Sequence, residues 1–290
     1  MPTPPGAGGI SPRQLVYSRE RVLYGVMVVV SLLVYAGLLL MALAPEVGSS
    51  RSEELEPGAL AGAILFYGLL LSALAVYAHG LALGRIRGNA IRVSERQLPL
   101  LHRLAAAHAR RLGLKRVPSI YVMESGGILN AFATRFFRRD FVIIYSDVLE
   151  LALAKGEAAV GFIVGHELGH IWRGHLKHRW LTLPARFVPY LGAAYSRACE
   201  YTCDRVGAYC QPDGAITGLL VLAAGKQLHP HIDVREYAGQ ADSEQDFWVR
   251  RAEMMSTHPH LPKRIAALIK AGAAIPAREQ WASPPTAVAA

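Results

Sequence analysis

Two long uncharged stretches stand out in the pattern of hydrophobic and polar positions. Residues 22–43 carry no charged side chain, and residues 60–83 are equally apolar apart from His79 near their end. Each stretch is long enough to cross the roughly 30 Å hydrocarbon core of a bilayer as a helix. The pattern therefore predicts a transmembrane helical hairpin over residues 22–83. A cleaved signal peptide for the first stretch and a buried hairpin of a soluble fold are the alternatives.

Downstream, helical and strand-like patterns follow one another. Residues 97–112 have the apolar spacing of an amphipathic helix, and residues 119–123 form an apolar run typical of a strand. Two further strand-like runs, residues 129–134 and 141–145, are separated by a basic turn and predict a β-hairpin with an edge strand. Residues 158–172 are typical of an apolar helix. The predicted fold class is therefore α+β, mostly helical.

The domain boundaries follow from these elements and from the polar, Pro- and Gly-rich ends of the chain. We expect a disordered basic tail over residues 1–21 and a disordered tail over residues 275–290. Between the membrane hairpin and the second tail, residues 84–274 are expected to form one folded domain.

Charged residues around the apolar stretches indicate an orientation. Arginines precede the first stretch and follow the second, whereas the connecting segment carries four glutamates against Arg51. The flanking arginines are Arg13, Arg19, Arg21, Arg85, Arg87, Arg92 and Arg96. Because positive charge near membrane spans stays on the cytoplasmic side, both ends of the chain and the domain 84–274 are expected in the cytoplasm.

Composition favours a membrane protein. Hydrophobic residues make up 52% of the chain and the mean hydropathy is +0.24, more apolar than an ordinary soluble domain. The net charge is +9, but the basic residues are mostly juxtamembrane and no stacking aromatics are interleaved with them. Anionic lipid headgroups explain this charge, so the lipid bilayer is an expected partner and nucleic acid is not.

The three cysteines are expected to be free thiols in a reducing cytoplasm. They are Cys199, Cys203 and Cys210. A thiolate metal site at Cys199 and Cys203 is an alternative.

The apolar helix predicted over residues 158–172 contains His166-Glu167-Leu168-Gly169-His170. Histidines four apart share a helical face and can bind one metal ion, as in the H-E-x-x-H signature of zinc proteases. Glu167 lies about 100° further round the helix, so its carboxylate can reach a water molecule at the metal. Core histidines satisfied by hydrogen bonds are the alternative, because unpaired polar groups are costly to bury.

A catalytic zinc site needs a third protein ligand. The metzincin extension requires glycine at position 173 and histidine at 176, where this chain has Arg173 and Leu176. Glu200 and Asp204 lie four apart on another predicted helix and share a face. Glu200 can complete the site while Asp204 hydrogen-bonds a ligating imidazole and fixes its tautomer. Two solvated acids on an amphipathic helix are the alternative.

Two more motifs accompany the zinc helix and the segment from Ser196 to Asp204. Asn130-Ala131-Phe132-Ala133 precedes them, and Ser256-Thr257-His258-Pro259 follows them. With these four motifs in this order, over roughly residues 90–270, the chain resembles the membrane-associated gluzincin metalloproteases. This family includes the HtpX heat-shock protease and the type 1 CAAX prenyl protease.

The resemblance implies a gluzincin-type domain and assigns roles within it. The implied ligands of one Zn2+ per chain are His166, His170 and Glu200. Glu167 would be the general base that activates water and then protonates the leaving amine, and Asp204 would support a ligand. His258 would stabilise the tetrahedral oxyanion near the metal. Asn130 would lie on an edge strand and contact the backbone of an extended protein or peptide substrate.

The chain departs from HtpX-type relatives between the zinc helix and the third ligand. Those relatives carry further membrane spans there, whereas only thirty positions separate His170 from Glu200 here. Residues 180–195 contain Arg186 and two prolines and are too short to span. We interpret them as a loop and short helix that touch the membrane surface.

Together these features predict an integral-membrane zinc endopeptidase, in the inner or plasma membrane if the source is bacterial. Its expected substrates are membrane or membrane-attached proteins, as in membrane protein quality control. A specific processing peptidase, for example one acting on lipidated C-termini, is the alternative enzyme. A non-catalytic scaffold that retains a zinc site and a basic membrane-surface binding module are the non-enzymatic alternatives. The oligomeric state is left open.

Overall fold

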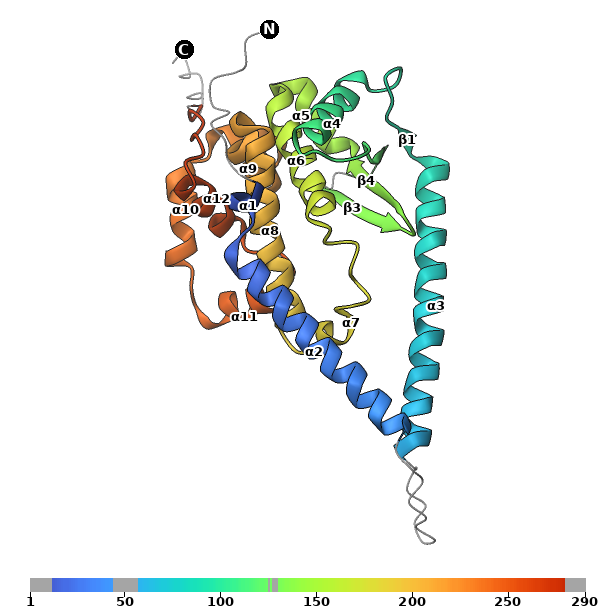
Figure 1. The fold of residues 1–290 in the computed structure, drawn as a ribbon. Coiled ribbons are helices and arrows are strands. Elements are labelled where there is room, and N and C mark those ends of the chain that lie inside the picture. Colours follow the sequence, from blue (N-terminus) through green and yellow to red (C-terminus); the bar gives the residue numbers. More distant parts are fainter. Residues whose placement is uncertain (1–11, 44–56, 125, 127–129, 280–290) are drawn as a thin grey trace, which may run out of the picture.

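The two apolar stretches form the two longest helices of the protein. A computed structural model describes residues 12–43, 57–124, 126 and 130–279 (Figure 1). Helices α2 (Ser18–Leu43) and α3 (Pro57–Asn89) are long and apolar enough to cross a membrane. They meet at their lower ends in Figure 1 and diverge upward, α2 toward α8 and α3 past the sheet.

Most of the apolar surface of α2 and α3 is exposed. Only 11% and 6% of their most apolar windows are buried inside the protein. A core hairpin of a soluble fold would bury most of this surface, so that alternative does not fit. The exposed apolar side chains are compatible with insertion of both helices into a membrane.

A mostly helical domain follows α3. Its helices are α4 (Pro99–Arg111), α5 (Ser146–Lys155), α6 (Glu157–Arg173), α7 (Leu183–Arg186), α8 (Leu191–Cys210), α9 (Ala215–Leu228), α10 (Val234–Ser243), α11 (Phe247–Met255) and α12 (Leu261–Lys270). The predicted fold class, mostly helical with a small sheet, is confirmed.

The small sheet contains the expected hairpin. Its strands, β1 (Ile91–Arg92), β2 (Ser119–Met123), β3 (Ala131–Phe136) and β4 (Arg139–Tyr145), lie in the order β1-β2-β4-β3. β3 therefore forms an edge and pairs antiparallel with β4. Residues 135–140, expected to be a turn, mostly continue the strands. Arg135 and Asp140 pair across them at 2.8 Å, and Phe137 turns the chain with a φ of 51°.

Both predicted tails are partly folded. Within the expected tail 1–21, residues 12–15 form α1 (Pro12–Leu15) and residues 18–21 begin α2. Leu15 is buried, and the backbone N–H of Tyr17 donates to Thr202, so contacts with the domain order this segment. At the other end, the N–H of Glu279 donates to the carbonyl of Pro230. Residues 1–11, 280–290 and Leu129 of the predicted strand lie outside the described residues.

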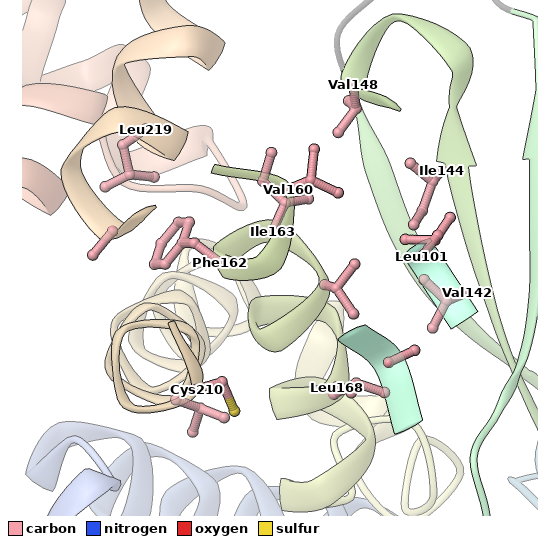
Figure 2. Close-up of a cluster of buried hydrophobic side chains, with 14 of the residues drawn as sticks. Leu101, Val142, Ile144, Val148, Val160, Phe162, Ile163, Leu168, Cys210 and Leu219 are labelled. Atoms are coloured by element: carbon pink, nitrogen blue, oxygen red, sulfur yellow. The ribbon is translucent and has the colours of Figure 1, made fainter. Parts of the chain in front are cut away.

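Helix α6 runs through the hydrophobic core. Phe162 and Leu168 are almost fully buried on it, as are Val142 and Ile144 on β4. Figure 2 shows these side chains with Leu219 of α9 around the helix. Because apolar side chains surround α6, its position and rotation relative to the sheet are fixed by packing.

Glycines bring the backbones of α6 and α8 unusually close. A Cβ at Gly165 would lie 2.9 Å from the Cβ of Cys210, and a Cβ at Gly207 would lie 2.9 Å from the carbonyl oxygen of Phe162. A Cβ at Gly169 would lie 3.2 Å from the Cα of Cys203. Larger residues would push the two helices apart. This spacing sets the distance between every side chain of α6 and α8 that faces the other helix.

We predict that Gly165→Ala lowers the free energy of unfolding by about 1–3 kcal/mol, because the new methyl group overpacks the contact between α6 and α8. The matched control is Gly239→Ala on α10, where nothing lies within 4 Å of the added Cβ. The control is expected to stabilise its helix by up to about 1 kcal/mol. Thermal unfolding in detergent measures both. Equal stability of the two variants would contradict the close approach of α6 and α8.

Candidate metal centre

Helix α6 supplies three of the predicted site residues. His166 and His170 lie one turn apart with ring centroids 5.3 Å from each other, and Glu167 lies between them in sequence. His166 and Glu167 are buried, and His170 is partly exposed. The helix ends at Gly174, whose φ of 78° suits glycine as a helix terminator. The site therefore lies in the last two turns of the core helix.

Glu200 of α8 faces both histidines. Its Oε2 lies 3.4 Å from Nε2 of His166, and its Oε1 lies 3.3 Å from Nε2 of His170. Donor atoms of a tetrahedral zinc site, each roughly 2.0–2.1 Å from the ion, are about 3.3–3.4 Å apart. The two imidazoles and the carboxylate thus fit Zn2+ in type and number, and each imidazole nitrogen lies at a suitable distance from one of the two carboxylate oxygens.

A buried charge network supports His166. Its Nδ1 lies 3.0 Å from Oδ1 of Asp204, as expected for a carboxylate that fixes a ligand's tautomer. Arg264 of α12 donates to both oxygens of Asp204, at 2.8 and 2.6 Å, and its Nη1 lies 3.4 Å from Oε2 of Glu200. Asp204 and Arg264 are both buried. The single charge of the guanidinium therefore offsets part of the charge of two buried carboxylates.

The surroundings of His166 and Glu200 favour positive charge between them. Burial disfavours protonated His166, but hydrogen bonds to Asp204 and Glu200 outweigh it and raise its pKa to about 10. Burial likewise opposes ionised Glu200, but hydrogen bonds from His166 and His170 bring its pKa well below the usual value. A cation is thus stabilised at the position where the metal would lie.

A second polar chain leads away from His170. Its Nδ1 lies 3.0 Å from Nδ1 of His175, whose Nε2 lies 3.3 Å from Oε1 of Glu20 in α2. Arg173 approaches Glu20 at 2.6 Å, and Thr202 donates a hydrogen bond to it. If Nε2 of His170 binds the metal, its Nδ1 carries the proton and donates to Nδ1 of His175, whose protonated Nε2 then faces the carboxylate of Glu20. The first apolar helix thus supplies the carboxylate at the end of this chain of polar contacts from His170.

The cysteines offer two other arrangements of possible metal ligands. Cys203 groups with His166 and His170, and Cys199 groups with Glu20 and His175. Burial raises the pKa of the Cys203 thiol well above its usual value, and its Sγ lies 3.9 Å from Nδ1 of His175. Glu200 instead lies at the Nε2 atoms of both histidines and suits the metal better.

The Cys199 group already contains a cation. The guanidinium of Arg173 approaches Glu20, so a metal ion there would meet a positive charge. All three cysteines are free thiols.

His258 lies at the open side of the centre. Its Nε2 is 3.7 Å from Oε1 of Glu200, and 63% of its side chain is exposed. Its Nδ1 pairs with the hydroxyl of Thr257 at 3.0 Å. Arg197 of α8 donates to the carbonyl oxygens of Glu253, Met254 and Ser256 at 2.7–2.9 Å. Arg197 therefore holds the segment that presents His258 to the site.

Asn130, expected on the edge strand, lies immediately before it. Its side chain accepts a hydrogen bond from the N–H of Ala131, and its carbonyl accepts one from the N–H of Tyr145. Among the described residues it makes no hydrogen bond or ion pair with His166, His170 or Glu200. Its role in substrate binding stays a prediction.

Four residues of the centre were not found by sequence reasoning. They are Glu20, His175, Arg197 and Arg264. Arg197 stands inside the segment from Ser196 to Asp204, and Arg264 follows the segment from Ser256 to Pro259, but their partners are distant in sequence. His175 follows the zinc helix without a recognised motif of its own. Glu20 lies in the first turn of α2, where an acidic residue is typical of a helix start. For each of these residues, only the tertiary contacts reveal the role.

Comparison with known families agrees with this geometry. Residues 95–188 and 181–271 match the model of Peptidase family M48, so the matched segments cover residues 95–271, more than half of the chain. A search of curated proteins finds no match.

We predict that Glu20→Gln lowers the affinity for Zn2+ by about 10- to 100-fold, because the imidazole chain that orients His170 loses its carboxylate. Competition with a chelating dye measures the affinity of the detergent-purified chain. The matched control is Glu244→Gln, an exposed position at the end of α10. Equal affinities of the two variants would show that the chain of polar contacts from His170 to Glu20 does not support the metal.

We also predict that Arg264→Met lowers the free energy of unfolding by about 3–5 kcal/mol, because Asp204 and Glu200 would keep their buried charges without the compensating guanidinium. The same substitution at exposed Arg235 on α10 should change stability by no more than about 0.5 kcal/mol. Chemical denaturation of both variants measures the difference. A small effect at Arg264 would contradict its role in charge balance.

Proposed function

Because the chain belongs to peptidase family M48, whose members are zinc metalloproteases and include HtpX and CAAX protease-type enzymes, we propose that it is a membrane-bound zinc endopeptidase. The observation that carries this proposal is the convergence of two imidazole Nε2 atoms on Glu200 at 3.3 and 3.4 Å. Glu167 lies on the same helix, next to His166.

The proposed mechanism divides the work among four side chains. Zinc, when bound, supplies Lewis-acid chemistry that polarises the peptide carbonyl and activates water. Glu167 takes the proton from the attacking water and later delivers it to the leaving amine. His258 donates a hydrogen bond to the oxyanion that develops on the carbonyl. Asp204 and Arg264 hold His166 in the tautomer that leaves Nε2 free to bind the metal.

The substrate is proposed to bind in an extended conformation. β3 is an edge strand and packs next to α6. An exposed strand edge offers unpaired backbone N–H and C=O groups to a peptide that adds as a further strand. Asn130, exposed immediately before β3, is proposed to contact the substrate backbone.

The proposed location is an integral membrane position with the catalytic domain in the cytoplasm. Two apolar helices precede the domain, and arginines flank their outer ends. A site beside these helices favours membrane or membrane-attached proteins as substrates, as in membrane protein quality control.

We predict that Glu167→Gln abolishes cleavage while zinc stays bound, because the amide keeps the shape of the side chain but cannot accept the proton. The expected loss in kcat is about 10²–10⁴-fold. The control is Glu157→Gln, exposed in the first turn of the same helix. Zinc content and cleavage of casein and of a membrane-embedded protein are measured together, with and without a chelator. Undiminished cleavage by Glu167→Gln would overturn the proposal, and cleavage of casein alone would contradict its substrate class.

A further inference from the structure

The segment between α6 and α8 lies along the first apolar helix and not at its end. The backbone N–H of Ala185 donates to the hydroxyl of Ser31 at 3.2 Å, and the hydroxyl of Tyr35 donates to the carbonyl of Trp180 at 2.8 Å. Tyr35 stands eight residues before Leu43, where α2 ends. Eight residues correspond to about 12 Å along a helix. Where α2 enters a bilayer of roughly 30 Å, this segment comes into contact with the lipid too.

The side chains of this segment suit such a contact. Trp180, Leu181, Phe187 and Val188 are exposed, and Phe187 is 81% exposed. Exposed side chains of this size are rare in clusters on soluble surfaces. Ala185 on the opposite side is buried against Met27 of α2. The segment therefore packs one side on α2 and presents a second, apolar side outward.

A distant part of the chain continues this apolar surface. On α11, Phe247, Trp248 and Met255 are exposed, and Trp248 is 75% exposed. The guanidinium of Arg251 on α11 lies 5.0 Å from the ring of Tyr190, so α11 is adjacent to the segment around α7. Figure 1 shows α7 and α11 on the same lower side of the domain, toward the junction of α2 and α3.

The segment between α6 and α8 is positively charged. No acidic residue lies between Glu167 and Glu200, a stretch that includes exposed Lys177 and Arg179. Tryptophan and other aromatic side chains beside lysine and arginine are typical of the interface between headgroups and acyl chains. Anionic headgroups attract the basic groups, and the aromatic side chains enter the apolar layer.

We propose that α7, its flanking loops and α11 form a bilayer-docking face, represented by Trp180, Phe187, Val188, Phe247, Trp248 and Met255. This inference rests on the proposed membrane location and specifies which part of the catalytic domain contacts lipid. His258 follows Met255 by three residues and lies 3.7 Å from Glu200, so the docking face borders the opening of the metal centre. The substrates are therefore peptide segments that emerge at the membrane surface.

Tryptophan quenching in vesicles tests this docking face. The chain has four tryptophans, at positions 172, 180, 248 and 281. Three variants each keep a single tryptophan: Trp180, Trp248 or Trp172. Each variant is reconstituted into vesicles of anionic and zwitterionic phospholipids. The acyl chains of these lipids carry bromine, which quenches tryptophan emission on contact. Trp172 serves as the control because it packs against the hydrophobic core. The expected result is a loss of emission from Trp180 and Trp248 that clearly exceeds the loss from Trp172.

Several outcomes would overturn the docking face. Quenching of Trp180 and Trp248 no stronger than that of Trp172 would show that the face does not contact lipid. Emission that is protected from bromine and shifts with the ratio of protein to lipid would indicate that a second copy of the chain covers it. If Trp172→Phe prevents folding, Trp180→Phe and Trp248→Phe are made singly in the otherwise unchanged chain. The quenching of each variant, subtracted from that of the wild type, then gives the contribution of the tryptophan that was replaced.

Flotation of the same vesicles separates this inference from the proposed function. Chains that float with the vesicles but show no quenching at Trp180 and Trp248 would contradict only the docking face. Chains that do not float would contradict the membrane location itself, and the docking face with it.

Discussion

The close approach of α6 and α8 is the constraint on which the centre depends. Glycines at positions 165, 169 and 207 remove the side chains that would separate the two backbones. The histidines of α6 and Glu200 of α8 therefore reach each other without bending either helix. Nε2 of His166 and Nε2 of His170 then lie 3.4 and 3.3 Å from the two carboxylate oxygens of Glu200, a separation typical of neighbouring donor atoms at a tetrahedral zinc ion. The geometry of the centre is thus set by backbone packing and not by flexible loops.

The two histidines are supported by different parts of the molecule. His166 is held through Asp204 and Arg264, which tie it to α8 and α12. His170 is held through His175 and Glu20, which tie it to α2. The first apolar helix is consequently both a candidate membrane span and part of the support for the metal.

Much of this arrangement follows from the sequence, but its supporting contacts do not. The periodicity of residues 158–172 and the four-residue spacing of Glu200 and Asp204 predict helical faces, because both are local properties. The hairpin and the two apolar helices were also predicted, and the fold class is confirmed. In contrast, Glu20 meets His175 across more than 150 positions, and the ordering of residues 12–21 depends on contacts with α8. Local patterns carry no information about such pairs.

X-ray absorption spectroscopy at the zinc edge tests the ligand set most directly. The zinc-loaded wild-type chain should show two imidazole ligands and oxygen ligands at about 2.0–2.2 Å, with no sulfur. Glu200→Ala should lose stoichiometric zinc under the same conditions. A zinc–sulfur distance of about 2.3 Å in the wild type, or full zinc retention by Glu200→Ala with an unchanged spectrum, would contradict a centre built from His166, His170 and Glu200.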